Sequence, residues 1–124
     1  MTSKIMVVDD DPGFRVTLVE ILEGEGRDVI AAEDGYQAVQ LASDSEIALI
    51  LMDIQMPGMN GVEALLEIKE LRPDCVVAMM TGYAADSLAQ QALEEGAMTI
   101  LQKPLSIGRI FEIVEEVLHE APRS

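Results

Sequence analysis

The sequence is poor in the residue types that form disulfides and aromatic cores. Its 124 residues include one cysteine, Cys75, and no tryptophan, and aromatic residues make up 3% of the chain. A single cysteine excludes an intrachain disulfide, and this composition fits a reducing, cytosolic setting. Hydrophobic residues nevertheless make up 49% of the sequence. We therefore expect a core built from Ile, Leu, Val, Ala and Met.

Basic residues are also scarce. Eight Lys and Arg stand against 23 Asp and Glu, which gives a formal net charge of −15. A surface this acidic repels nucleic-acid phosphates and anionic membranes, so direct binding to either is not expected. The same charge favours cations and basic partner surfaces.

Long apolar runs are missing as well. No stretch approaches the roughly 20 residues of a membrane-spanning helix. Met1 to Lys4 leads directly into a four-residue apolar segment, which is shorter than the apolar region of a secretory signal. The sequence therefore predicts a cytoplasmic protein without a membrane segment.

The chain instead contains a regular alternation of short apolar runs and helical patterns. Predicted strands lie at residues 5–8, 29–32, 47–52, 75–80 and 98–101. A predicted helix follows each strand, starting near residues 12, 36, 62, 84 and 107. The last helix carries a continuous apolar stripe, whereas the helix at 84–94 has few large apolar residues.

This alternation predicts an α/β fold with a doubly wound, five-stranded parallel sheet. Strands that are apolar throughout are buried on both faces, which requires helices on each side of the sheet. The pattern fits one domain over residues 1–120, and residues 121–124 are interpreted as a tail or the start of a linker.

Polar side chains stand where the predicted strands end. Asp9 and Asp10 follow the first strand, Asp53 the third, Thr81 the fourth and Lys103 the fifth. Ligands of open parallel sheets bind outside the carboxyl ends of the strands. We therefore expect these residues, far apart in sequence, to meet at one edge of the sheet.

Three carboxylates at one edge repel each other unless some are protonated or a cation lies among them. Oxygen ligands without His or Cys favour magnesium over zinc. Magnesium beside a carboxylate and a lysine is typical of phosphoryl transfer, and a carboxylate can itself be the nucleophile. Taken alone, however, Asp9 to Asp11 is equally consistent with a solvated acidic run that caps a helix.

Four segments together resemble the response regulator receiver domains of two-component signal transduction, and in particular the chemotaxis-regulator-like ones. They are VVDDDP at 7–12, LMDIQMPGMNG at 51–61, MTG at 80–82 and QKP at 102–104. The segments occur in the family's order and spacing and cover nearly the whole chain. The resemblance implies a flavodoxin-like (βα)5 fold with strand order 2-1-3-4-5.

The resemblance also implies a role for each acidic residue. Asp53 would accept a phosphoryl group from the phosphohistidine of a sensor histidine kinase or a phosphotransfer protein. Asp10, Asp53 and the backbone carbonyl of Gln55 would bind Mg²⁺ directly, and Asp9 would hold a metal-bound water. The protein would then be a signalling phosphoacceptor, with only self-phosphorylation and autodephosphorylation chemistry of its own.

Lys103 and Thr81 would contact the phosphoryl oxygens, and the Lys103–Pro104 peptide would be cis. Thr81 would draw its loop inward and remodel the fourth helix, so that the fourth helix, fifth strand and fifth helix report phosphorylation to an attached or separate effector. A phosphorylation-linked homodimer also fits this scheme.

The family often has an aromatic residue where this chain has Ile100, which argues against a switch by rotation of an aromatic side chain. Tyr83 stands where the family tunes the lifetime of the phosphoryl group.

Two other functions are compatible with parts of this pattern. Phosphatases of the haloacid-dehalogenase type also use an aspartate nucleophile, but they need a second acid two residues later, where this chain has Gln55. A degenerate receiver that only docks is the other alternative, although all the key residues are present.

Of the remaining residues, Cys75 is expected to be buried, whereas Met56 and Met59 are expected at the surface.

Overall fold

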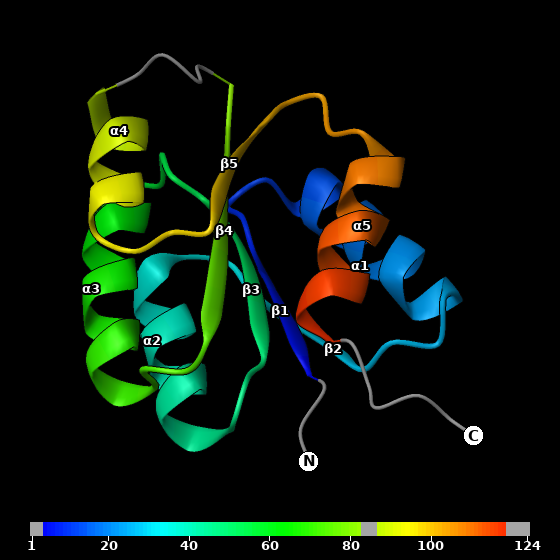
Figure 1. Cartoon of the computed structure of the whole chain (residues 1–124), viewed down its shortest axis with the longest axis horizontal. Helices are drawn as coiled ribbons and strands as arrows, with labels where there is room; N and C mark the ends of the chain where they lie inside the picture. Colours follow the sequence, from blue (N-terminus) through cyan, green and yellow to red (C-terminus); the bar gives the residue numbers. More distant parts are fainter. Residues whose placement is uncertain (1–3, 83–86, 119–124) are drawn as a thin grey trace.

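The computed structural model describes residues 4–82 and 87–118, in which five strands and five helices alternate (Figure 1). The strands are β1 (Ile5–Val8), β2 (Val29–Ala32), β3 (Leu49–Asp53), β4 (Val76–Thr81) and β5 (Thr99–Gln102). The helices are α1 (Pro12–Gly24), α2 (Gly35–Asp44), α3 (Gly61–Leu71), α4 (Ser87–Glu94) and α5 (Ile107–Val117).

The strands form one parallel sheet in the order β2-β1-β3-β4-β5. This confirms the predicted flavodoxin-like fold and its strand order. In the register, Val8 of β1 pairs with Ala32 on one side and with Met52 on the other. The residues that follow Val8 and Met52 therefore start at the same level of the sheet, which brings Asp9 near Asp53.

Helices cover both faces of the sheet. Figure 1 shows α2, α3 and α4 on one face and α1 and α5 on the other. Alternate residues of β1 point to opposite faces of the sheet. Met6 and Val8 belong to the core cluster under α2, α3 and α4, and Ile5 and Val7 belong to the cluster under α1 and α5. All four side chains are fully buried, as the apolar run predicted.

Polar side chains cap the helices that follow the strand ends. Asp11 accepts hydrogen bonds from the backbone of Gly13 and Phe14, and Pro12 occupies the first turn of α1. Asn60 and Glu63 form a reciprocal capping box at the start of α3. These caps define the residue at which each helix begins.

The structure differs from the sequence prediction at several boundaries. β3 begins at Leu49 rather than at residue 47, although Ile47 is buried. Ile47 is apolar because it is buried, but the hydrogen-bonded pairing of β3 with its neighbouring strands begins only at Leu49. The expectation for Met56 was wrong: its side chain is 7% exposed and packs in the core beneath α2 and α3. Met59 is partly buried.

None of the helices in the described ranges has the length and apolarity of a bilayer span.

Cys75 precedes β4 and is 2% exposed, as predicted. Burial raises the pKa of its thiol to about 11, because an apolar environment disfavours the thiolate.

We predict that Cys75 of the folded protein reacts slowly with iodoacetamide at mildly alkaline pH. The raised pKa alone lowers the thiolate fraction by roughly 100-fold relative to a free thiol, and burial limits access further. Mass spectrometry of the native protein, with the urea-unfolded chain as control, measures the rate. Equal rates for the two forms would show that the thiol is accessible.

Candidate functional site

The carboxyl ends of the strands meet at one edge of the sheet. The amide of Ile54 donates to the carbonyl of Met80 at 2.9 Å, and the amide of Lys103 donates to the carbonyl of Thr81 at 2.8 Å. These two bonds continue the strand ladder past the ends of β3 and β5. They hold Asp53, Thr81 and Lys103 at neighbouring positions along this edge.

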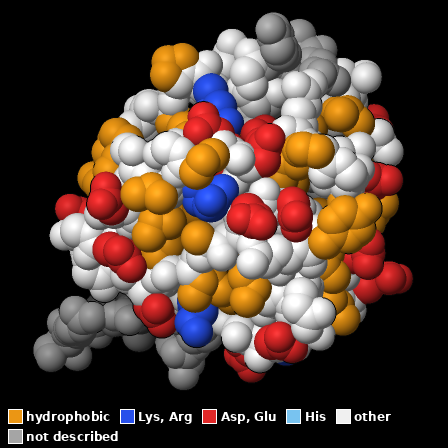
Figure 2. All heavy atoms as spheres, turned by 180° about the vertical axis from the view of Figure 1, so that it is seen from behind, with side chains coloured by type: hydrophobic (Ala, Val, Ile, Leu, Met, Phe, Trp, Pro, Cys, Tyr) orange, Lys and Arg blue, Asp and Glu red, His pale blue; other side chains and the backbone are white. Residues whose placement is uncertain are grey.

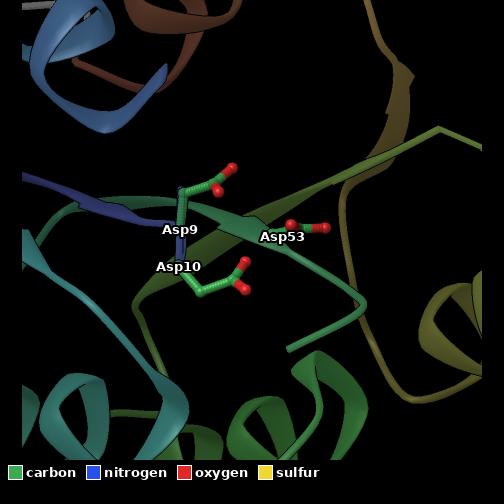
Figure 3. A group of neighbouring side chains, drawn as sticks. All are labelled: Asp9, Asp10 and Asp53. Carbon is green, nitrogen blue, oxygen red and sulfur yellow. The ribbon is translucent and has the colours of Figure 1, made fainter. Parts of the chain in front are cut away.

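The three predicted acids lie together. One carboxylate oxygen from each of Asp9, Asp10 and Asp53 lies within 4.8 Å of the other two. Figure 3 shows the side chains reaching from the end of β1 and the end of β3 into a common space. Asp9 and Asp53 are buried, whereas Asp10 is exposed. The cluster is therefore open to solvent on one side.

Asp9 is the most enclosed of the three acids, with no exposed surface. Its Oδ1 accepts the amide of Asp11 at 2.9 Å, and its Oδ2 accepts Lys103 Nζ at 2.8 Å. Arg15 of α1 donates from Nη1 to the backbone carbonyl of Asp9 at 2.6 Å. These contacts fix both the side chain and the backbone at the end of β1.

Asp53 is 8% exposed and accepts two hydrogen bonds. The amide of Gln55 donates to Oδ1 at 3.2 Å, and Lys103 Nζ donates to Oδ2 at 3.4 Å. Burial raises the pKa of the Asp53 carboxyl above its usual value, and neighbouring Asp9 adds to this rise. Lys103 and the Gln55 amide act in the opposite direction and favour the carboxylate.

Lys103 binds both buried acids through one ammonium group. Burial disfavours its charge, but hydrogen bonding to Asp9 and the charge of Asp53 outweigh that effect, so the pKa of Lys103 lies above its ordinary value. The Lys103–Pro104 peptide is cis, as predicted. The ammonium also lies 4.2 Å from the centre of the Phe14 ring.

The sequence alone did not assign Phe14 or Arg15 to the site. Only the folded position of α1 beside the end of β1 brings Arg15 to Asp9 and Phe14 to Lys103.

The other predicted residues flank this centre. Thr81 ends β4 and is 1% exposed, and Ile100 of β5 packs partly buried against the core under α2, α3 and α4. Gln55 is exposed two residues after Asp53. Tyr83 lies outside the described residues, as does the predicted 121–124 tail.

The donor set suits a hard cation. Three carboxylates face one space, and one ammonium group does not balance their charge. Carboxylate oxygens without thiolate or imidazole partners are the ligands that Mg²⁺ and Ca²⁺ take. The cluster can therefore hold a divalent metal.

The backbone beneath Asp53 is closely packed against the start of α3. The Gly61 amide donates to the Ile54 carbonyl at 2.7 Å. A Cβ added at Gly61 would lie 2.8 Å from the Asp53 carbonyl oxygen and 2.8 Å from Ile54 Cα. Glycine is required here because only a residue without a side chain allows this approach.

Comparison with known proteins gives one consistent family. Residues 5–115 match the response regulator receiver domain. Sporulation initiation phosphotransferase F of Bacillus subtilis is 35% identical over 118 residues, covering 95% of each protein. Chemotaxis protein CheY of the same organism is 33% identical over 120 residues, covering 96% of this chain and 100% of CheY.

The fold comparison agrees. A CheY-like receiver domain protein from Methanospirillum hungatei superposes with a TM-score of 0.88 at 32% identity, covering 93% of this chain and 92% of the other. Other relatives are longer: the chain is 38% identical to the transcriptional regulatory protein ZraR of Klebsiella oxytoca over 92% of its own length but spans 26% of ZraR.

We predict that Gly61→Ala destabilises the fold by about 1–3 kcal/mol, because the added methyl group overlaps backbone atoms that cannot move independently. Gly24→Ala at the end of α1 is the matched control, since nothing lies within 4 Å of its added Cβ. Urea unfolding measures both. A wild-type midpoint for Gly61→Ala would contradict the close approach.

Proposed function

This chain belongs to the response regulator receiver family, and we propose that Asp53 is its phosphoacceptor, assisted by Mg²⁺ at Asp9, Asp10, Asp53 and the Gln55 carbonyl. Receiver domains are signalling phosphoacceptors of two-component systems, and that is the function of this domain. The observation that carries the residue assignment is the meeting of three carboxylates and Lys103 at one edge of the sheet.

The proposed reaction transfers a phosphoryl group from a phosphohistidine to Asp53. A carboxylate oxygen of Asp53 forms the new P–O bond while the P–N bond breaks, and the leaving imidazole nitrogen keeps the electron pair and takes a proton from solvent. The donor is a sensor histidine kinase or a phosphotransfer protein.

Asp53 must be ionised to attack, and its burial works against ionisation. Lys103 lowers this cost in part, because its ammonium lies 3.4 Å from Asp53 Oδ2. The same group is placed to meet phosphoryl oxygens once they are attached there. Thr81, at the end of the neighbouring strand, would contact the phosphoryl group from the β4 side.

The acidic cluster supports magnesium as the resident cation. When bound, the ion would neutralise charge on the phosphoryl oxygens. Asp10 and Asp53 would be its direct carboxylate ligands, and Asp9, already bonded to Lys103, would hold a metal-bound water. A receiver domain of sensor kinase PA1611 from Pseudomonas aeruginosa, 25% identical with a TM-score of 0.85, has magnesium coordinated in its active-site cleft.

A related response regulator from Burkholderia pseudomallei, 30% identical, has a phosphorylated aspartic acid and a calcium ion. That structure supports the pairing of an aspartyl phosphate with a divalent cation in this family.

The proposed output is a change in the face formed by α4, β5 and α5. Helix α4 buries two alanines, Ala89 and Ala92, whereas α5 buries Ile110, Ile113 and Val114. The smaller buried side chains make α4 the less firmly anchored helix. Movement of Thr81 toward a phosphoryl group would therefore shift α4 more readily than α5.

The proposed partners are a kinase or phosphotransfer protein and an attached or separate effector, within the cytoplasm. Figure 2 shows acidic side chains spread over one face, with a few basic side chains between them, which suits a partner with a basic surface. A beryllofluoride-activated NtrC4 receiver domain, 31% identical, is a dimer. A phosphorylation-linked homodimer is part of the proposal on that ground.

We predict that Asp53→Asn abolishes labelling by acetyl phosphate with Mg²⁺, because the amide oxygen is not a nucleophile of comparable strength. Asp74→Asn, an exposed change before β4 at the opposite edge of the sheet, should label like wild type. Intact-mass spectrometry detects the added phosphoryl group. Equal labelling of Asp53→Asn would remove this residue as the acceptor.

We also predict that EDTA stops labelling of the wild type and that Mg²⁺ restores it. Asp10→Asn should raise the Mg²⁺ concentration needed for half-maximal labelling by about 10-fold or more, because a charged ligand is lost. Asp74→Asn again serves as the control. Labelling that is indifferent to EDTA would contradict the metal assignment.

A further inference from the structure

The Lys103 ammonium lies over an aromatic ring as well as between two acids. Its distance to the centre of the Phe14 ring is 4.2 Å, within the range of a favourable cation–π contact. It is the only cation–π contact among the residues that the structure describes. Only 24% of the Lys103 side chain is exposed, so the contact is partly shielded from water.

The position of the Phe14 ring is fixed by the start of α1. Asp11 caps the helix and accepts the backbone amide of Phe14 at 3.4 Å. The ring is partly buried and lines a small hollow of about 100 Å³ together with Leu18 and Leu105, among others. It is therefore held between the helix cap and the segment that follows Pro104.

We propose that Phe14 is a positioning residue for Lys103. The proposal rests on the function above, in which Lys103 meets the phosphoryl oxygens. An ammonium group has three N–H donors, and here Asp9 and Asp53 accept from it at 2.8 and 3.4 Å. The aromatic face attracts the positive charge without competing as a directed hydrogen-bond acceptor.

This geometry lets the ammonium turn from a carboxylate to a phosphoryl oxygen without leaving the ring. An aliphatic side chain of similar size would fill the same space but would supply only dispersion contacts. The ring's electrostatic attraction, and not its volume, is the property that assists phosphoryl transfer.

Fluorinated phenylalanines at position 14 test this directly. Fluorine withdraws electron density from the ring face and changes the ring's shape little, so mono-, di- and trifluorophenylalanine give a graded loss of cation attraction. The chain has two phenylalanines, and Phe111 on α5 is the matched control. Phe111 is partly buried like Phe14.

Two quantities are measured for each variant. The first is the NMR shift of Lys103 Nζ in the metal-free protein, which requires no activity. The second is the rate of acetyl phosphate labelling at saturating Mg²⁺, with the urea midpoint as a check on stability. We expect a stepwise loss in rate that reaches about 3- to 10-fold in the trifluoro variant, and an equal or larger loss in Phe14→Leu.

The expected pattern is a graded change in both quantities at position 14, an unchanged urea midpoint and a flat series at position 111. A flat series at position 14, or a loss that follows the urea midpoint instead of the fluorine number, overturns the proposal. Lys103→Met separates this result from failure of the function itself. If Lys103→Met labels like wild type, the role of Lys103 is wrong; if it is slow while the position-14 series is flat, only the Phe14 inference fails.

Discussion

The placement of one ammonium group between two buried carboxylates is the constraint on which the site depends. Asp9 has no exposed surface and Asp53 has little, and two such groups so close together are unfavourable without a cation. Lys103 binds both, but the third acid, Asp10, leaves excess negative charge at the edge of the sheet. That excess makes the site suited to a divalent ion. In the proposed function, the bound ion would also balance the negative charge of a phosphoryl group on Asp53.

The fold delivers this arrangement through strand register rather than through any local motif. Val8 and Met52 are paired neighbours, so the residues after them emerge together, and the Lys103 amide is bonded to the Thr81 carbonyl. Lys103 is 50 positions from Asp53 and 94 from Asp9. A shift of one residue in any of these strands would exchange the side chains that face the two helix layers and would move the polar residue at the strand end away from its partners.

The sequence predicted most of this because strand ends are readable: an apolar run that stops at Asp9, at Asp53 or before Lys103 marks both the strand and the edge. It could not predict that Lys103 lies closer to Asp9 than to Asp53, since strand twist and loop shape decide that distance. It misplaced Met56, because a loop position carries no periodicity that indicates inward packing. Phe14 also belongs to an apolar helical face, and that pattern is the same whether the ring meets core side chains or an ammonium group.

The same charge balance bears on which part of the structure would change conformation on phosphorylation. In the proposed function, a phosphoryl group on Asp53 would compete with Asp9 for Lys103 and would contact Thr81, so the change would begin at the ends of β4 and β5. Helix α1 is held to the end of β1 by Arg15 and contacts Lys103 through the Phe14 ring, and both contacts oppose movement on that side. Helix α4, on the other face, is anchored by Ala89 and Ala92. Ile100 in β5 supplies no aromatic ring that could rotate, so the proposed route runs from Thr81 to α4, which buries smaller side chains than α5 does.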